Sequence, residues 1–291
     1  MIMKLFERKY NLIILVLALF AGITACEKDV ILDLASIEGK YIIVEGNLID
    51  DGSRQWIRLT RSSSYYDVTT GDAVQDASVL VEGNNQVWQF QELFPDSLPG
   101  YYFNSQISSA LTETMYHLHI ETTDNSIFFA QSELRPVPVL DSVTVKLNPF
   151  SELNFFDTTV YDLIAHFADL PGDGDHYLFN LYINNKLKTP RPTDKEPMSD
   201  VNLDEYSSYA VLNLNENDIA PGDTLILEMR SISKEKFDFY SIFFFQTDLS
   251  GNPFAGAPPA NIPTNLSEGA RGFFQVSAVN RKSAIFQPPQ P

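Results

Sequence analysis

The sequence predicts a mainly β protein with two β-sandwich domains, the first immunoglobulin-like and the second carrying one packed α-helix. Short apolar or alternating segments recur along most of the 291 residues and are separated by turn-forming residues. Phe (21) and Tyr (13) are frequent, and aromatic side chains suit the half-buried surface of a sheet. One segment in the second half, residues 233–249, has a serine followed by an acidic residue at its start, which favours a helix.

Residues 1–25 have the layout of a secretory signal peptide. Lys4, Arg8 and Lys9 precede an uncharged apolar run over residues 12–20, and small residues follow it. A membrane-spanning helix needs about 20 apolar residues, so this run is too short to cross a bilayer. We therefore expect an exported protein from which this segment is cleaved.

Cys26 is the only cysteine of the chain, so it cannot form an internal disulfide. The stretch Ile23-Thr24-Ala25-Cys26 resembles a lipobox, in which the cysteine receives lipid after cleavage before it. We predict lipidation at Cys26 and a tether over residues 26–36, with outer-membrane lipid as the partner of Cys26. The alternative is an ordinary signal peptide followed by an incidental free thiol.

The first predicted sandwich spans residues 37–134. Its expected strands are residues 40–50, 55–61, 78–82, 86–90, 100–103, 115–123 and 126–132. Gly83-Asn84-Asn85 has the composition of a hairpin turn between two of them. Tyr65 and Tyr66 fall in a predicted exposed loop, and tyrosine combines an apolar ring with a hydroxyl group. This loop is the candidate contact for a ligand or partner.

The second predicted sandwich spans residues 139–291, after the stiff connector Arg135-Pro136-Val137-Pro138. Its expected strands are residues 141–147, 158–168, 176–183, 209–214, 224–231 and a closing strand at 272–279. Residues 186–204 are poor in large apolar side chains and are expected to form a long surface excursion. The helix at 233–249 is expected to pack against the second sheet.

Composition and motifs exclude several classes of function. The formal net charge of −18 argues against nucleic-acid binding, which requires clusters of Lys and Arg. The sequence contains no Gly-x-Ser-x-Gly, phosphate-binding loop, dinucleotide fingerprint or His-Glu-x-x-His motif. We expect no catalytic residues and no cofactor.

Two groups of residues could bind a metal ion, but neither matches a known pattern. Asp169, Asp173 and Asp175 offer oxygen ligands of the type that calcium prefers, on a segment that also reads as an ordinary turn. His117, His119 and Glu121 (with alternate spacing on one strand) share a face that is more often simply exposed to solvent. The aspartates are weak calcium candidates, and no metal is predicted.

Several segments together resemble the family named domain of unknown function 4249. They include Tyr41-Ile42-Ile43-Val44-Glu45-Gly46, Pro99-Gly100-Tyr101-Tyr102, Leu134-Arg135-Pro136-Val137-Pro138 and Phe167-Ala168-Asp169-Leu170-Pro171-Gly172-Asp173. The resemblance implies a Bacteroidota outer-membrane lipoprotein that works with a TonB-dependent β-barrel receptor. It implies no catalytic residues. The cluster Glu27-Lys28-Asp29 after Cys26 separately resembles the surface-export signals of such lipoproteins, and it favours exposure at the cell surface over a simple polar spacer.

These expectations favour a non-enzymatic, lipid-anchored accessory protein that binds a nutrient or peptide for uptake. A surface hydrolase acting on glycans is an alternative, since its two carboxylates could be any pair that the fold brings together. A structural or adhesive role in the envelope is a third possibility. The acidic composition is compatible with all three functions.

Overall fold

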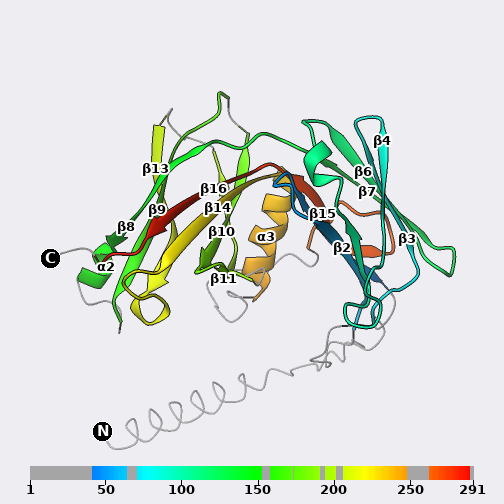
Figure 1. The fold of residues 1–291 in the computed structure, drawn as a ribbon, viewed down its shortest axis with the longest axis horizontal. Coiled ribbons are helices and arrows are strands. Elements are labelled where there is room, and N and C mark those ends of the chain that lie inside the picture. The colour runs from blue at the N-terminus through cyan, green and yellow to red at the C-terminus, as the bar shows by residue number, and fades with distance from the viewer. Residues whose placement is uncertain are drawn as a thin grey trace, which may run out of the picture. The chain divides into compact units, whose positions relative to one another are not determined.

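Four β-sheets, packed in two pairs, make up most of the part of the chain that the structure describes (Figure 1). The computed structural model describes residues 41–63, 71–152, 158–172, 174–190, 194–200, 206–247 and 262–288. All of them belong to one compact unit that spans residues 37–291. The predicted signal peptide, Cys26 and its tether, Tyr65, Tyr66 and Asp173 lie outside the described residues.

The first pair of sheets forms a sandwich with strand orders β15-β1-β2-β5 and β4-β3-β6-β7. The strands are β1 (Ile42–Ile49), β2 (Gln55–Arg61), β3 (Ser78–Gly83), β4 (Gln86–Phe90), β5 (Tyr101–Asn104), β6 (Met115–Glu121), β7 (Ile127–Glu133) and β15 (Ala270–Ser277). Val44 and Ile57 from one sheet and Val81 and Leu118 from the other lie in one buried core. Alternate side chains fill this core, as the two-residue period of a strand requires.

The hairpin between β3 and β4 confirms the turn prediction. Asn84 and Asn85 have φ angles of 48° and 56°, which is the left-handed conformation that a two-residue hairpin turn needs at both positions. Asparagine tolerates this conformation better than most side chains. The turn therefore follows directly from the local sequence.

The second pair of sheets has strand orders β13-β9-β8 and β11-β10-β14-β16, with β12 also paired to β10. The strands are β8 (Leu140–Leu147), β9 (Val160–Ala168), β10 (His176–Ile183), β11 (Lys186–Leu187), β12 (Glu196–Ser199), β13 (Tyr206–Asn215), β14 (Thr224–Ile232) and β16 (Val279–Ile285), and a short helix α2 (Pro149–Glu152) follows β8. Leu163, Phe167, Phe179 and Leu227 are among the residues of its core. The predicted mainly β fold with sandwich packing is confirmed.

Helix α3 (Lys234–Thr247) confirms the predicted helix within the described residues. Ser233 caps it, since the Ser233 Oγ accepts a hydrogen bond from the Lys236 N–H at 3.2 Å. Tyr240 packs with Leu178 of β10 in a small cluster of its own. Among the described residues, no helix has both the length and the apolar character needed to span a membrane.

Helix α3 also contacts the first sandwich, which the sequence did not predict. The ring of Phe239 lies 5.6 Å from the ring of Phe273 on β15. Figure 1 shows α3 between the strands β10 and β14 of the second sandwich and β15 of the first. The helix is therefore a wedge between the two sandwiches.

The end of the chain crosses from one sandwich to the other. β15 pairs in parallel with β1, and only Ala278 separates it from β16, which pairs antiparallel with β14. All of residues 139–291 were expected in the second sandwich, whereas residues 270–277 form a strand of the first. Local pattern could not reveal this, because the pairing of β1 with β15 joins residues more than 200 positions apart in the sequence.

The predicted surface excursion over residues 186–204 was wrong for the residues that the structure describes. β11 and β12 both pair with β10 in this stretch. The side chains of Thr189 and Asp200 are buried. The expectation rested on the scarcity of large apolar side chains in this segment. The segment is held by backbone pairing and polar contacts instead.

Candidate ligand pocket

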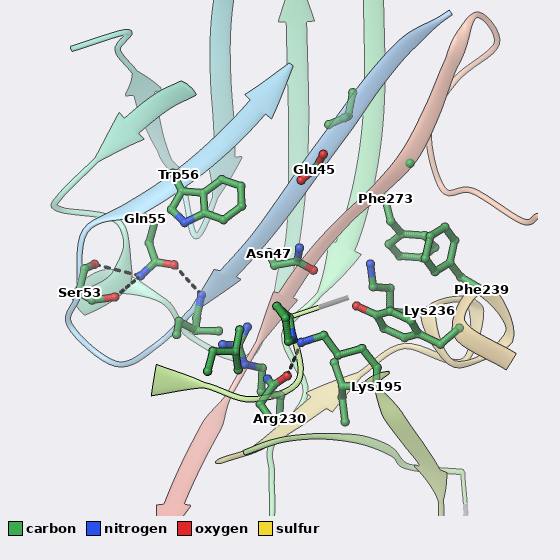
Figure 2. A pocket seen from close by; sticks show the side chains of 18 of the residues that line it. Glu45, Asn47, Ser53, Gln55, Trp56, Lys195, Arg230, Lys236, Phe239 and Phe273 are labelled. Atoms are coloured by element: carbon green, nitrogen blue, oxygen red, sulfur yellow. Dashed lines mark hydrogen bonds between the residues drawn. The ribbon is translucent and has the colours of Figure 1, made fainter. Parts of the chain in front are cut away.

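A pocket of about 590 Å³ lies where the two sandwiches and α3 meet (Figure 2). Asn47 of β1 and Trp56 of β2, which point away from the first core, line one side. Leu178 and Asn180 of β10, which alternate with residues of the second core, line the other. Each strand buries every second side chain in its own sandwich, so the remaining side chains face the space between the two.

Lys236 lies at the wall that α3 contributes, and it is surrounded by aromatic rings. Its Nζ lies 4.7 Å from the ring centroid of Phe239, 4.9 Å from that of Tyr240 and 4.5 Å from that of Phe273. The side chain is only 4% exposed. Ring faces attract a cation electrostatically, but they accept none of its three hydrogen bonds as an oxygen would.

The environment of Lys236 disfavours its charged form. Burial is the main cause that lowers the pKa of Lys236 to about 7, and repulsion from Lys195 and Arg230 adds to it. Glu45 on β1 acts in the opposite direction but does not compensate. Among the described residues, Lys236 forms no ion pair and its ammonium donates no hydrogen bond.

Lys195, which precedes β12, reaches the same pocket with neutral partners. Its Nζ donates to Asn180 Oδ1 at 2.6 Å and to the backbone carbonyl oxygen of Thr189 at 2.5 Å. Burial lowers the pKa of Lys195 to about 8, and the charge of Arg230 contributes. No carboxylate of the described residues forms an ion pair with Lys195.

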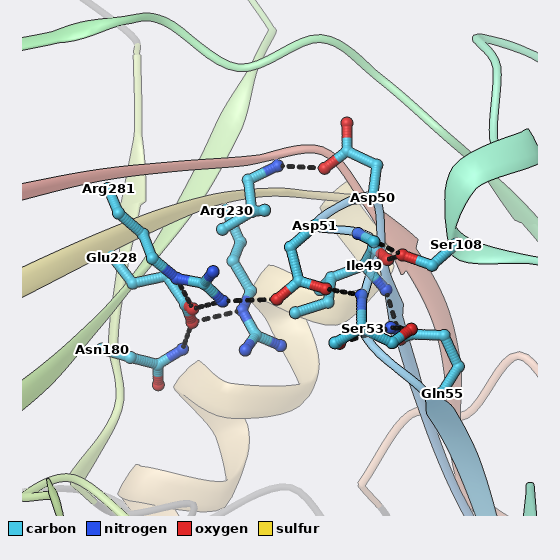
Figure 3. Close-up of polar contacts among 12 residues, drawn as sticks. Ile49, Asp50, Asp51, Ser53, Gln55, Ser108, Asn180, Glu228, Arg230 and Arg281 are labelled. Atoms are coloured by element: carbon cyan, nitrogen blue, oxygen red, sulfur yellow. Dashed lines mark hydrogen bonds and ion pairs between the residues drawn. The ribbon is translucent and has the colours of Figure 1, made fainter. Parts of the chain in front are cut away.

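Glu228 of β14 is the buried acid behind the pocket, and its side chain is completely inaccessible to solvent. It accepts hydrogen bonds from Arg230 Nε at 2.6 Å, Arg281 Nε at 2.7 Å and Asn180 Nδ2 at 2.8 Å (Figure 3). Burial alone would raise the pKa of Glu228, but the two arginines and the amide hold it below its ordinary value. Glu228 and Asp51, which pairs with Arg281, together balance the two arginines, and neither acid forms an ion pair with Lys195 or Lys236.

A polar network positions the wall formed by β1 and β2. The Ile49 N–H donates to Gln55 Oε1 at 2.9 Å, and the Ser108 hydroxyl donates to the Ile49 carbonyl at 2.6 Å (Figure 3). The Val279 N–H donates to Asp50 Oδ1 at 2.8 Å, which ties the same turn to β16. Satisfied buried polar groups of this kind hold a single geometry. The backbone that carries Trp56 at the start of β2 is therefore fixed in place.

Aromatic rings continue from the pocket onto the first sandwich. Trp56, which is 37% exposed, lies 5.3 Å from Tyr101 of β5 between ring centroids. Arg58 stacks over Tyr101 at 5.3 Å and pairs with Glu45 at 3.3 Å. An apolar ligand group at the pocket could therefore rest against an aromatic surface.

The charge of the pocket is opposite to that of the whole chain. In the part of the chain that the structure describes, its charged lining residues are Arg54, Lys195, Arg230 and Lys236, against the single acid Glu45. The chain as a whole has a formal net charge of −18. Clefts lined by one sign of charge concentrate ligands of the other sign, so this pocket favours anions.

The aspartates that were weak calcium candidates engage other partners where they are described. Asp169 accepts a hydrogen bond from the Tyr177 hydroxyl at 2.9 Å, and Asp175 lies 3.9 Å from Arg135. Asp200 accepts hydrogen bonds from the N–H groups of Gly174 and Asp175. No group of three or more His, Cys, Asp or Glu within the described ranges is arranged to hold a metal. With Asp173 outside those ranges, the weak calcium candidate stays a prediction.

The other predicted positions lie elsewhere. His117, His119 and Glu121 share the outer face of β6, as their spacing predicts, and the ring of His119 lies 5.0 Å from that of Phe129. The pocket is at the start of β2, whereas the segment that leads toward Tyr65 and Tyr66 follows the other end of that strand. The tyrosine loop remains untested as a contact site.

Sequence reasoning missed the residues that build the pocket. Lys236 was not singled out within the helix expected at 233–249, and Lys195 fell in the expected surface excursion. One signal was available: the helix at 233–249 is aromatic nearly all round, so a charged residue among those rings has little solvent-facing surface left to occupy. The meeting of that helix with β15 could not be inferred locally.

Fold and pocket together define a mainly β, two-sandwich protein with a ligand-sized pocket between its sandwiches. The chain belongs to the DUF4249 family, described as a domain of unknown function, whose model matches residues 27–283. Two solved structures that are similar to this chain are titled "Cytokine receptor complex", in crystal forms 2 and 1A. Both are 10% identical with a TM-score of 0.23, and the matches cover 67% of this chain and 92% and 85% of theirs. At these values they carry no argument about function. No curated protein matches the chain.

Proposed function

We propose that this protein is a non-enzymatic, lipid-anchored outer-membrane protein that captures a small solute and works with a TonB-dependent β-barrel receptor in its uptake. The pocket between the sandwiches carries the proposal. Its volume of about 590 Å³ falls within the range of small-molecule sites. Its walls combine apolar side chains such as Leu178 and Phe273 with polar and charged ones such as Asn47 and Lys236, so they can hold an apolar group and orient a charged one.

The proposed anchor rests on the sequence. Ile23-Thr24-Ala25-Cys26 follows a signal-like segment, and the match to the family begins at residue 27, directly after Cys26. A lipid on Cys26 would hold the described unit at the membrane surface, where a captured solute is close to a receptor. The receptor itself is proposed from the family resemblance.

The composition of the pocket favours binding over hydrolysis. Glycoside hydrolysis ordinarily uses two carboxylates on opposite sides of the scissile bond, about 5–10 Å apart. Among the described residues that line this pocket, Glu45 is the single acid. The acid behind them, Glu228, is fully buried and already bonded to Arg230 and Arg281. The pocket therefore favours solute binding over glycoside hydrolysis.

Solute capture can be tested by native mass spectrometry of the full chain purified in detergent from its own envelope. We expect a bound small molecule that is released on denaturation. The variant Asn47→Phe places a ring at the pocket wall without altering either core, because Asn47 is exposed and points outward. It should lose the adduct while remaining folded by circular dichroism. An adduct that persists in Asn47→Phe would place the solute elsewhere.

The partnership requires a separate experiment. The tagged chain is purified from gently solubilised outer membranes, and the proteins that accompany it are identified by mass spectrometry. A β-barrel receptor in stoichiometric amount supports the uptake role. Recovery of the chain alone, with its solute still bound, would retain capture and remove the receptor from the proposal. A Cys26→Ala variant that still fractionates with the membrane would contradict the lipid anchor.

A further inference from the structure

Lys236 is a buried cation whose surroundings lack a counter-charge. Its side chain is 4% exposed, it lines the pocket, and its Nζ contacts the ring faces of Phe239, Tyr240 and Phe273. No oxygen atom of the described residues accepts a hydrogen bond from it. An unpaired buried ammonium is costly, so the pocket is more stable when an anion occupies it.

Neighbouring cations make a negative counter-charge near Lys236 still more favourable. Among the described residues, Lys195 donates only to neutral oxygens, those of Asn180 and Thr189. Arg230 is matched by the buried Glu228. The positive charge near Lys236 is therefore in excess, inside a chain that is otherwise strongly acidic. A ligand that brings a negative charge would reduce this excess.

The walls next to Lys236 specify the rest of the ligand. Phe239 and Phe273 flank the ammonium, and Leu178 also lines the pocket. Trp56 lines the pocket further from Lys236 (Figure 2). These side chains offer apolar surface and no hydrogen-bonding group toward a ligand apart from the indole N–H. The ligand should therefore combine a charged end with an apolar or aromatic body.

We infer that the pocket binds a small organic carboxylate whose charged end pairs with Lys236 and whose apolar body packs against Phe239, Phe273 and Trp56. A phosphate monoester fits less well, because it carries a charge of about −1.5 to −2 at pH 7 and would be repelled more strongly than a carboxylate by Glu45, the acid whose charge acts on Lys236. This inference rests on the proposed capture function and names the class of its solute.

Binding of the carboxylate should depend on pH. The charged and titratable groups around Lys236 are Tyr240 on α3, Lys195 before β12, Arg230 on β14 and Glu45 on β1. The lowered pKa of Lys236 means that a carboxylate binds best below about pH 7, where the ammonium is formed. Affinity should fall above that pH, by at most roughly tenfold per pH unit for one linked proton.

The test is isothermal titration calorimetry of the full chain with octanoate, 3-phenylpropionate and indole-3-acetate, each compared with its uncharged amide. We expect at least one carboxylate to bind about tenfold or more tightly than its amide, as a charged hydrogen bond implies. Lys236→Met should remove that difference. Lys234→Met is the matched control, because Lys234 is an exposed residue on the same helix and pairs with Asp238; it should bind as the parent does.

Each other outcome overturns the inference. Equal affinity for acid and amide, or unchanged affinity in Lys236→Met, would show that Lys236 does not bind the ligand's charged group. Binding of inorganic phosphate but of no carboxylate would assign the cations to phosphate. An uncharged solute that binds in the pocket would leave the capture function standing and remove the carboxylate, whereas a pocket that takes no small molecule would contradict both. The comparison of acid with amide on the parent chain stands even if Lys236→Met does not fold.

Discussion

Arg281 Nη2 lies 2.8 Å from Asp51 Oδ2, and this ion pair joins the second sandwich to the first (Figure 3). The same nitrogen lies 2.6 Å from the fully buried carboxylate of Glu228. Arg281 is on β16, and Asp51 is in the turn that leads from β1 to β2. One guanidinium therefore connects the two walls between which the pocket lies.

Removing Arg281 should loosen this connection. In Arg281→Met, Glu228 keeps Arg230 and Asn180 but loses one charged partner while it remains buried, and we expect the free energy of unfolding to fall by about 2–4 kcal/mol. Urea denaturation followed by circular dichroism measures the change. The exposed neighbour Lys282 provides the control, since Lys282→Met should change stability by less than about 0.5 kcal/mol. Equal stabilities of the two variants would show that the ion pair contributes little.

Gly272 allows β15 to approach β1 at the pocket. Its φ angle is +97°, and a Cβ at this position would collide with the backbone carbonyl oxygen of Val44. Gly272→Ala should therefore destabilise the chain by more than about 2 kcal/mol and weaken solute binding. Gly222→Ala is matched in backbone conformation, with φ +94°, but has open space around the added Cβ. If both variants lose the same stability, backbone strain and not the close approach is responsible.

Lys236 should make stability depend on pH in a defined direction. Its pKa is about 7 in the folded chain and 10.5 ordinarily, so between these values the unfolded chain binds more protons. The stability of the parent should therefore rise as pH increases from about 7 to 10.5, and the cost of burying the charge is fully present below pH 7. Lys236→Met lacks this cost and should be more stable, by at most about 5 kcal/mol at low pH. Denaturation near pH 6, 8 and 10 should show the gain shrinking, and a constant gain would contradict the assignment.

Local sequence predicts most of the elements of this fold. The hairpin at Asn84 and Asn85 and the cap at Ser233 follow from the conformational preferences of those residues, and both occur. Ile57 and Leu59 lie in the core and Trp56 outside it, as the two-residue period of a strand over residues 55–61 requires. Such features depend on neighbours within a few positions, so they can be derived without the tertiary structure.

The pocket could not be predicted in the same way. Asn47, Asn180 and Lys236 come together because β15 pairs in the first sandwich, β16 pairs in the second, and α3 lies between the two sandwiches. A strand's pattern shows which face is buried but not which other strand it will pair with. The long-range parallel pairing of β1 with β15 is therefore the fact that sequence reasoning lacked, and the candidate site depends on it.

The central claim, that the space between the sandwiches is a ligand site, is tested most directly by the fluorescence of Trp56. The chain has two tryptophans, and Trp88 is buried in the first core, so Trp88→Phe leaves Trp56 as the sole reporter. Titration of this variant with the carboxylate panel should change the Trp56 emission saturably, and Asn47→Phe should abolish the change. Saturable binding measured by calorimetry with no change in Trp56 emission, or with full binding in Asn47→Phe, would contradict the claim.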